Sequence, residues 1–420
     1  MKKNIVVIIL AAGKGERMKS GLAKVMHPVC ARPMLGYVFD LIQGLKAEET
    51  VVVLGHKHEE VSRIVPKGIK VAIQKELKGT ADAVKQALRP LRNFKGAILV
   101  LYGDNPLLTK ETINKLLKHH IDSNPAATLL TAVVDKPAGY GRILRDKYSS
   151  LCGIAEEKES DEFQKEIKEI NTGIACFNKD DLSFALSRIK PNNRKKEYYL
   201  TDAVEILYKN GRLIESVNLS MAEEALGVNS RVDLAKANKI MQKRINKIFM
   251  EAGVTLVSPA STHIAYGAKI GRDTVIYPFT VIEKDVKIGK HCSVGPFAHL
   301  REGTRLEDDV LAGNFLEITR SKLGSKTLIK HFAYIGDANI GRRANVGAGT
   351  VTANFDGKSK SKVVIQDDAF IGSDTVLIAP VKVGKKAKTG AGSVVIKNNN
   401  IPAGKIVAGV PAKLITLKKR

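Results

Sequence analysis

A glycine-rich loop near the start of the chain has the composition of a phosphate-binding loop. Residues 10–18 read LAAGKGERM and directly follow an apolar run. Glycine lets a backbone approach a ligand closely, exposed amides can face phosphate oxygens, and Lys14 and Arg17 add positive charge. The loop has neither G-x-G-x-x-G spacing nor the Gly-Lys-Ser/Thr ending of a P-loop. By itself it is therefore equally consistent with a tight turn.

Polar residues that follow later apolar runs could complete such a site. Lys24 lies in SGLAKVMH, Gly79 and Thr80 lie in QKELKGTADA, and Asp104 directly follows LYG at the end of an apolar run. Ligands bind beyond the carboxyl ends of the strands in open parallel sheets, so a carboxylate at this position could bind a metal ion. Taken alone, Asp104 could also be a turn residue or a helix cap.

A histidine in the second half of the chain could do different chemistry. His331 lies two residues after Ile329 and four before Ile335, which places it off the ladder of aliphatic residues described below. We therefore expect its side chain to face outward. An imidazole can accept a proton near neutral pH, as an amine that attacks a thioester requires. A single histidine can equally be an ordinary surface residue, which is the interpretation left open for His291 and His299.

The first half of the chain must position the phosphate loop. Through residues 1–230, short runs rich in β-branched residues alternate with amphipathic stretches. This alternation predicts an α/β fold with a mostly parallel, Rossmann-like sheet that helices cover on both faces. The predicted strands are residues 5–10, 50–54, 71–74 and 97–102, and the predicted helices between them include 34–45 and 81–88.

The second half has a different period. Residues 230–252 place apolar side chains at three- and four-residue spacings and predict an amphipathic linker helix. Beyond it, aliphatic residues recur every six residues, and Thr389 is the one exception in the second run. A triangular coil has this period, because each of its sides is one short strand with an inward aliphatic residue. The ladder comprises Ile264, Ile270, Ile276, Ile282, Ile288, Val294, Leu300 and Leu306, and then Ile365, Ile371, Leu377, Val383, Thr389, Val395, Ile401 and Val407.

A polar segment interrupts this ladder. The sequence ANFDGKSKSK lies between Thr352 and Val363. A loop expelled from a regular solenoid is a candidate functional element.

Composition narrows the class of protein. Hydrophobic residues make up 44% of the 420 residues and charged residues 26%, as in ordinary folded domains. The four cysteines have no CxxC spacing, which indicates neither a disulfide framework nor a zinc site and favours a reducing cytosol. The apolar part of the start MKKNIVVIILAAG is short and predicts a buried strand, so we expect a soluble, cytoplasmic protein without membrane insertion.

The formal net charge of +25 has several possible meanings. Basic proteins bind nucleic acids, acidic membrane surfaces or phosphorylated substrates. Here the lysines are spread along the whole chain, and the only dense basic tail is residues 418–420. We therefore expect a basic solvated surface and no nucleic-acid partner.

Together these segments resemble the nucleotide-sugar pyrophosphorylases. The whole chain is similar to the bifunctional family that joins an N-acetylglucosamine-1-phosphate uridylyltransferase to a glucosamine-1-phosphate N-acetyltransferase. In the first half the resemblance rests on LAAGKGERM, KVMHP, LYGDNPL, GYGRI, EINTGI, EYYLTD and GVNSR. In the second half it rests on GPFAHLREGT, GNFLEI, NVGAGTVTANFDG and IGSDT.

The resemblance implies an organisation and a function for each part. Residues 1–229 would form the nucleotidyltransferase domain, 230–252 the linker helix, and 253–420 a left-handed parallel β-helix of hexapeptide repeats that acts as an acetyltransferase. The enzyme would acetylate glucosamine-1-phosphate with acetyl-CoA and then transfer a uridylyl group from UTP, with Mg²⁺, to form UDP-N-acetylglucosamine for peptidoglycan and lipopolysaccharide synthesis. Family members are homotrimers. The alternative left open is a nucleotidyltransferase alone, with a β-helix that serves trimerisation or regulation.

The resemblance also assigns residues to the first reaction site. Arg17 and Lys24 would act on the triphosphate and the departing pyrophosphate, and Asp104 and Asn229 would hold Mg²⁺. Leu77 departs from the family pattern, because a glutamine usually lies there beside the uracil. The nucleotide and the UDP-sugar would be bound by Leu10, Ala11, Ala12, Gly13, Gly15, Gln74, Gly79, Thr80, Tyr102, Gly141, Glu156, Asn171 and Asn229.

For acetyl transfer, the resemblance makes His331 the base and Glu317 the residue that orients it. Glucosamine-1-phosphate would be bound by Arg301, Tyr334, Asn345 and Lys360, and acetyl-CoA by Ala348, Asn354, Phe355, Ser373 and Ala391. Thr319 and Gly409 depart from the family pattern, because cations that contact the sugar phosphate and the CoA phosphates usually lie there. Loss of one such contact weakens binding by about 1.5–3 kcal/mol.

Overall fold

A computed structural model describes residues 4–91, 93–194 and 196–415. The basic tail at residues 418–420 lies outside the described residues. The chain divides into two compact units, residues 1–240 and 241–420.

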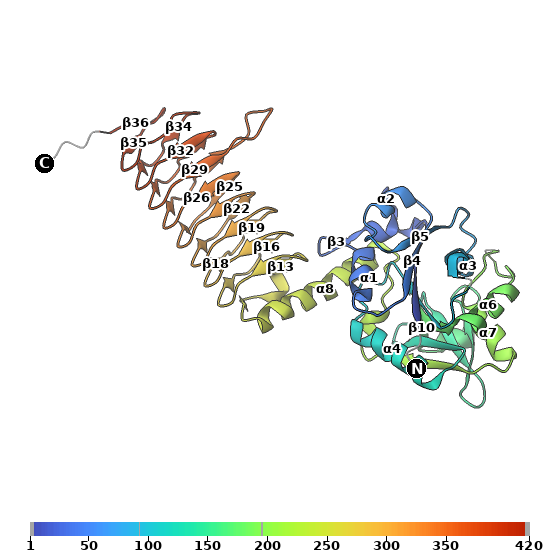
Figure 1. Ribbon diagram of the computed structural model, residues 1–420. Coiled ribbons are helices and arrows are strands. Elements are labelled where there is room, and N and C mark those ends of the chain that lie inside the picture. Colours follow the sequence, from blue (N-terminus) through green and yellow to red (C-terminus); the bar gives the residue numbers. More distant parts are fainter. Residues whose placement is uncertain (1–3, 92, 195, 416–420) are drawn as a thin grey trace. The chain divides into compact units, whose positions relative to one another are not determined.

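The first unit is built on one twisted sheet (Figure 1). Its strands run in the spatial order β11-β7-β10-β6-β1-β4-β5, and all of them are parallel except β10. The hairpin of β8 (Gly141–Arg145) and β9 (Leu151–Ala155) extends from β10. The prediction of a mostly parallel sheet is therefore confirmed. The main strands are β1 (Ile5–Ala11), β4 (Glu49–Leu54), β5 (Lys70–Ile73), β6 (Ala97–Tyr102), β7 (Ala127–Val133), β10 (Glu169–Asn178) and β11 (Ile214–Asn218), and a small separate sheet pairs β2 (Pro28–Val29) with β3 (Arg32–Pro33).

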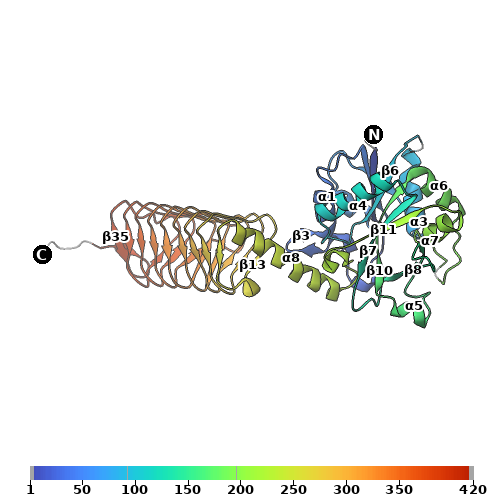
Figure 2. The same ribbon diagram turned by 90° about the horizontal axis from the view of Figure 1, so that it is seen from below.

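Helices cover both faces of this sheet (Figure 2). Alternate residues of β1 point to opposite faces, so Val6, Ile8 and Leu10 enter one core, whereas Val7 and Ile9 enter the other. The first core also contains α3 (Thr80–Leu88), α6 (Lys179–Arg188) and α7 (Asp202–Lys209), and the second contains α1 (Met34–Ile42), α2 (His58–Ser62) and α4 (Lys110–Ser123). The remaining short helices are α5 (Glu162–Glu166), η1 (Glu16–Met18), η2 (Lys24–Met26), η3 (Arg89–Leu91) and η4 (Ala222–Ala225).

Helix α8 (Arg231–Glu251) spans the division between the units. In its second half, the amide of Asn246 donates to the carbonyls of Pro259 (2.8 Å) and Thr262 (3.2 Å). The amide of Gln242 donates to the carbonyl of Ile264 at 3.2 Å. The start of the second unit includes η5 (Pro259–Ser261). The helix side chains satisfy backbone carbonyl groups there, as a capping element does at the end of a solenoid.

The second unit is a parallel β-helix with three faces (Figure 2). The first face consists of β12 (Thr255–Leu256), β15 (Val275–Ile276), β18 (Ser293–Val294), β21 (Leu311–Ala312), β24 (Leu328–Ile329), β27 (Asn345–Val346), β30 (Phe370–Ile371), β33 (Lys388–Thr389), β35 (Ile406–Ala408) and the antiparallel β36 (Lys413–Leu414). The second consists of β13 (His263–Ile264), β16 (Val281–Ile282), β19 (His299–Leu300), β22 (Leu316–Thr319), β25 (Ala333–Gly336), β28 (Val351–Ala353), β31 (Val376–Ile378) and β34 (Val394–Val395). The third consists of β14 (Lys269–Ile270), β17 (Lys287–Ile288), β20 (Arg305–Leu306), β23 (Lys322–Leu323), β26 (Ala338–Ile340), β29 (Val363–Ile365) and β32 (Val381–Val383).

The six-residue ladder forms the core of this β-helix. Its members are buried, apart from the half-buried Ile270. Thr389 also points inward and is 3% exposed. Its hydroxyl accepts a hydrogen bond from the backbone amide of Gly372 at 2.9 Å and lies 3.0 Å from the hydroxyl of Thr375. The exception in the aliphatic pattern is therefore compatible with burial because the hydroxyl has partners.

The polar segment leaves the coils between β28 and β29 (Figure 1), as predicted. Phe355 and Lys360 pair across it in an antiparallel bridge. Asp356 closes its tip by accepting hydrogen bonds from the backbone amides of Lys358 (3.0 Å) and Ser359 (2.8 Å). Among the described residues, no helix is long and apolar enough to cross a membrane.

Candidate active sites

A cavity of about 680 Å³ opens beyond the carboxyl ends of β1 and β6 in the first unit. The glycine-rich loop forms one wall, and the segments around Gln74 and Asn229 form others. The predicted residues that line it are Leu10, Ala11, Ala12, Gly13, Gly15, Arg17, Lys24, Gln74, Gly79, Thr80, Tyr102, Asp104 and Asn229.

Gly15 explains how the loop and Lys24 fit together. Its φ of 67° lies in the left-handed region. A β-carbon at this position would lie 2.6 Å from the β-carbon of Lys24, so only glycine leaves room for the lysine. A further contact fixes the end of the loop, because the guanidinium of Arg231 donates to the carbonyl of Met18 at 3.2 Å.

Lys24 contacts both predicted metal ligands. Its ammonium group donates to a carboxylate oxygen of Asp104 and, at 2.6 Å, to the amide oxygen of Asn229. The backbone brings these two residues together, because the amide of Val228 donates to the carbonyl of Asp104 at 3.0 Å. Two oxygen atoms from distant parts of the sequence therefore converge on one cationic group.

The donor set fits a divalent cation that phosphates help to hold. Among the described residues, no group of three or more histidine, cysteine and acidic side chains could bind a metal ion. Asp104 and Asn229 instead provide two oxygen atoms that already meet at one positive charge. Mg²⁺ is commonly bound by one or two protein oxygens together with substrate phosphates and water.

The far end of the cavity contains the residues assigned to the base. Gln74 is 4% exposed, and its amide donates to the carbonyl of Gly79 (3.0 Å) and to Asp82 (2.8 Å). Gly79 has a φ of 107°, and a β-carbon there would clash with the backbone of Tyr198. The hydroxyl of Thr80 accepts from the amide of Leu200 at 2.9 Å. The segment is therefore rigid, with its polar groups already oriented.

Gly141, Glu156 and Asn171, assigned to the sugar, form a second cluster beside the cavity. Gly141 and Asn171 are register partners on β8 and β10. Glu156 accepts a hydrogen bond from the hydroxyl of Thr201 at 2.8 Å. Burial, and then the negative charges of Glu156 and Asp104, raise the pKa of Tyr102. Tyr102 also lines the cavity.

Several cavity residues were missed as individual predictions. They are Lys158, Glu197 and Tyr199, whereas Leu77, which also lines the cavity, was named above as a departure from the family pattern. Glu197 and Tyr199 belong to the EYYLTD motif, which could have indicated them. Burial, and then Glu197 and Glu156, raise the pKa of Tyr199 to about 12. Lys158 carries no comparable sequence signal, because nothing in its neighbourhood predicts that it reaches the cavity.

In the second unit, four of the residues assigned to acetyl transfer follow one corner of the β-helix. Register pairs join Tyr334 to Val351, Val351 to Val376, and Val376 to Val394. Three residues before each of them lies a corner position, so equivalent corners in successive coils carry His331, Ala348, Ser373 and Ala391. His331, Ser373 and Ala391 are exposed, and Ala348 is half-buried. The base and three acetyl-CoA candidates thus form a single column.

Exposed aromatic rings occupy the same corner in the earlier coils. Phe279, Phe297, Phe315 and Phe332 lie two residues before register partners on the second face. They are 58%, 47%, 60% and 55% exposed. The rings of Phe279 and Phe297, and of Phe297 and Phe315, stack with centroids 5.0 Å apart. Along this corner, large apolar side chains are therefore followed by small residues beyond His331.

Glu317 does not contact His331. Its carboxylate instead accepts from the guanidinium of Arg301 at 2.8 Å, and no hydrogen bond joins Glu317 to His331 in the described part of the chain. Glu317 is the register partner of Tyr334 on the adjacent strand, whereas His331 lies at the corner. The expectation that Glu317 orients the histidine is therefore not met in this structure, because Arg301 provides a stronger partner.

A second charged group lies where Thr319 departs from the family pattern. Thr319 is 2% exposed, whereas neighbouring Arg320 is exposed and donates to both oxygens of Asp337 at 2.7 and 2.8 Å. Asp337 also accepts from the amide of Asn354. Arg320, Asn354 and the charge of Lys360 together lower the pKa of Asp337. The cation near this position is thus Arg320, and Asp337 already pairs with it.

The remaining candidates differ in their surroundings. Asn345 is half-buried on β27, and Phe355 is exposed on the expelled loop. Gly409 is exposed in the turn before β36.

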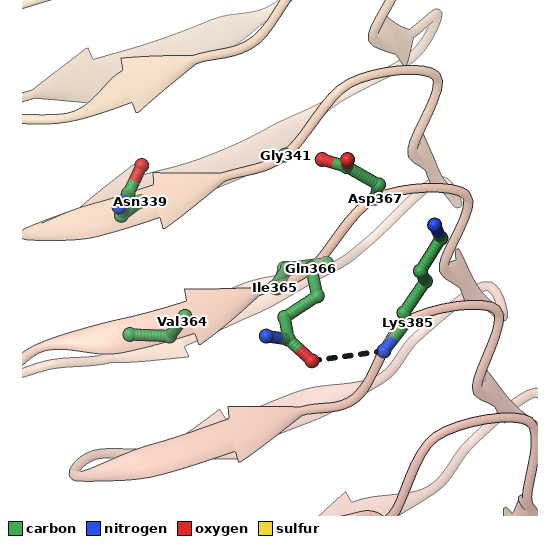
Figure 3. A pocket seen from close by; sticks show the side chains of 7 residues that line it. All are labelled: Asn339, Gly341, Val364, Ile365, Gln366, Asp367 and Lys385. Carbon is green, nitrogen blue, oxygen red and sulfur yellow. Dashed lines mark hydrogen bonds between the residues drawn. The ribbon is translucent and has the colours of Figure 1, made fainter.

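The third face of the β-helix carries a separate hollow of about 260 Å³ (Figure 3). In it, the side-chain carbonyl of Gln366 accepts from the backbone amide of Lys385 at 3.0 Å. None of the predicted site residues lines this hollow, so it is separate from the corner column. It is lined by Asn339, Gly341, Val364, Ile365, Gln366, Asp367 and Lys385.

Known proteins resemble both units. Residues 7–167 match the model of the MobA-like NTP transferase domain. Residues 262–315 match the bacterial transferase hexapeptide (six repeats), and residues 362–397 match the hexapeptide repeat of succinyl-transferase. These matches agree with the strand order of the first unit and with the three-faced coils of the second.

Curated relatives match almost the whole chain. The bifunctional protein GlmU of Geobacillus sp. (strain WCH70) is 44% identical over 421 residues, which is 92% of each chain. That of Thermosipho africanus (strain TCF52B) is 43% identical and covers 93% of this chain and 92% of its own. That of Geobacillus thermodenitrificans (strain NG80-2) is 40% identical and covers 96% and 94%. The chain therefore belongs to the bifunctional GlmU family.

Proposed function

We propose that the chain makes UDP-N-acetylglucosamine in two steps, with one active site in each unit. The second unit acetylates glucosamine-1-phosphate, and the first unit transfers a uridylyl group to the product. The observation that carries this proposal is the presence of two separate constellations, each suited to one reaction. A cavity with a phosphate loop and paired oxygen ligands lies in one unit, and a histidine column lies in the other.

Uridylyl transfer requires alignment of charged groups rather than a side-chain nucleophile. A phosphate oxygen of the sugar phosphate attacks the α-phosphorus of UTP, and the bond to the leaving pyrophosphate breaks. The amides of the glycine-rich loop, with Arg17 and Lys24, would stabilise charge on the triphosphate. A divalent cation, which we propose to be Mg²⁺, would be held by Asp104 and Asn229 and would neutralise phosphate charge.

Acetyl transfer requires a base that takes a proton from the attacking amine. The amine of glucosamine-1-phosphate attacks the thioester carbonyl of acetyl-CoA, a C–N bond forms, and the C–S bond breaks. His331 would take the proton from the amine, and the CoA thiolate that leaves would be protonated in turn. Arg301, Tyr334, Asn345 and Lys360 would hold the sugar phosphate, and Arg320 is a further cation near Thr319.

We also propose that the chain forms a homotrimer in the cytoplasm, and the exposed corner column supports its self-association. Ala348, Ser373 and Ala391 provide only one shallow side of a binding site. Exposed Phe279, Phe297, Phe315 and Phe332 continue the same corner, and a contiguous exposed apolar strip is typical of an interface. A second copy of the chain would cover these rings and provide the other wall of the acetyl-CoA groove.

The proposal is tested by incubating the protein with UTP, glucosamine-1-phosphate, acetyl-CoA and Mg²⁺, omitting one component at a time and separating the products. We expect UDP-N-acetylglucosamine only from the complete mixture and N-acetylglucosamine-1-phosphate when UTP is omitted. Uridylylation of supplied N-acetylglucosamine-1-phosphate without any acetyl transfer would instead support a β-helix that is only a scaffold. Full uridylyl transfer by Asp104→Ala would contradict the metal assignment.

A further inference from the structure

Lys24 lies at the point where the two oxygen ligands of the first site converge. Its ammonium group donates to Asp104 and Asn229 at the same time. The side chains of Lys24 and Asp104 are only 13% and 17% exposed. This ion pair differs from the surface pair of Lys70 and Glu49, in which the lysine side chain is 56% exposed.

An ammonium group and a divalent cation cannot share this point. Mg²⁺ requires oxygen ligands about 2.0–2.1 Å away in octahedral geometry, and a second positive charge within hydrogen-bonding distance of the same oxygens would repel it. The lysine therefore has to leave Asp104 and Asn229 before a metal ion can use them. Because the pair is largely buried, moving the ammonium group away would leave two unpaired charges with little access to water. The lysine therefore needs a new anion, and the carboxylate needs a new cation.

The cavity provides the place to which Lys24 can move. Lys24 lines the same space as the glycine-rich loop, together with Lys14 and Arg17. Gly15 packs against the stem of Lys24, so the side chain already lies along the loop that would bind phosphates. A triphosphate in this space would offer the ammonium group a new set of anionic oxygens.

We propose that Lys24 is an internal counter-ion that occupies the divalent-cation position until a nucleotide arrives. On this proposal, which rests on the proposed uridylyltransferase function, phosphates draw the ammonium group from Asp104 and Asn229, and the metal takes its place. Lys24 thus keeps the buried carboxylate neutralised in the empty enzyme. It also makes metal binding and nucleotide binding depend on each other, so a metal ion binds weakly before the phosphates are present.

The test measures Mn²⁺ binding to the full-length protein without nucleotide, from the electron paramagnetic resonance signal of free Mn²⁺. In Lys24→Met the competing charge is absent, so we expect Mn²⁺ to bind more tightly than in the wild type by about 5- to 150-fold, the usual range of such couplings. Lys24→Gln keeps a hydrogen-bond donor for Asp104 and should show the same direction, which covers the case that Lys24→Met does not fold.

Three further variants show whether charge is responsible and where the ion binds. Lys24→Arg retains a competing cation and should bind Mn²⁺ about as weakly as the wild type. Lys70→Met removes a lysine from the exposed pair with Glu49, 2.8 Å long, and should change nothing. Adding Asp104→Asn to Lys24→Met should remove the gained affinity, which locates the ion.

The outcomes separate this inference from the function on which it rests. Equal Mn²⁺ affinity in the wild type, Lys24→Gln and Lys24→Met would overturn the counter-ion role even if the enzyme makes UDP-N-acetylglucosamine. Weaker binding in the neutral variants would also overturn it, because Lys24 would then support the metal site. A protein that binds Mn²⁺ as inferred but never consumes UTP would contradict the proposed function alone.

Discussion

The two sites of this protein are built in opposite ways. In the first unit, segments far apart in the sequence meet around a cavity, and Lys24, Asp104 and Asn229 converge on one point inside it. In the second unit, successive coils each contribute one residue to an exposed column that begins at His331. All the residues that line the first site belong to one unit and surround a cavity, whereas those of the second form an exposed column.

This difference separates two ways of making a site. A cavity can hold a charged lysine and a carboxylate away from water because the two groups form an ion pair. The outer surface of a solenoid cannot, so its charged groups pair along that surface instead, as Arg301 does with Glu317 and Arg320 with Asp337. The contrast predicts that activity at the first site depends on buried polar contacts. Activity at the second site should depend on the second copy of the chain that would cover the column.

The largest expected effects come from removing one central residue in each unit. Asp104→Ala should lower uridylyl transfer by about 100- to 1,000-fold, because charge stabilisation at the leaving pyrophosphate is lost.

His331→Ala should lower acetyl transfer by about 100- to 10,000-fold, because the general base is lost. Each variant should leave the other reaction unchanged in separate assays. A variant that impairs both reactions equally would show that the sites are not independent.

A smaller effect is expected from filling the corner column. Ala391→Tyr places a large side chain where the column has only small ones, and it should raise the KM for acetyl-CoA about tenfold, or about 1.4 kcal/mol. The kcat at saturating acetyl-CoA should change less. Ala403→Tyr is the matched control, because Ala403 is exposed at a different corner of the last coils. If both tyrosines have the same effect, the column is not the acetyl-CoA site.

The smallest effect concerns pH and the first unit. Burial, and then the charges of Glu156 and Glu205, raise the pKa of Asp202 to about 6. An unfolded aspartate has a pKa of about 3.9, so the folded state binds this proton more tightly. Asp202 therefore stabilises the fold when protonated, and this contribution is lost as the pH rises from about 4 to about 6.

Asp202→Asn should remove that dependence. Its unfolding midpoint should exceed that of the wild type by a few degrees at pH 7, and the difference should shrink toward pH 4. Asp180→Asn, at a residue whose side chain is 81% exposed in α6, should show no such trend. A constant difference between Asp202→Asn and the wild type at every pH would refute the assignment.

The two units also differ in how much of each could be predicted from the sequence. Counting in sixes identified the inward residues of the coils, including the polar Thr389, because a repeat converts sequence position directly into position around the axis. In the first unit, the strands β1, β4, β5 and β6 and the loop after β1 could be identified from their runs of β-branched residues. The contact of Lys24 with Asp104 and Asn229 could not, because it depends on how three separate segments pack.

The misplaced expectation for Glu317 has a different cause. That expectation came from the family resemblance and not from the local pattern of the sequence. In the structure Glu317 is the register partner of Tyr334 on the neighbouring strand, and its carboxylate accepts a hydrogen bond from Arg301. Lys158 was missed because its loop reaches the cavity only through tertiary folding.

By itself, the sequence determined the two architectures, the presence of a linker helix between them, and the residue types available for each reaction. These follow from local periodicity and from backbone requirements such as the positive φ at Gly15. Only the tertiary structure decided which charges meet: Lys24 with the two oxygen ligands, Arg301 with Glu317, and Arg320 with Asp337. The physical reason is that electrostatic pairing depends on distance in space and on burial, and neither quantity is encoded by any one segment.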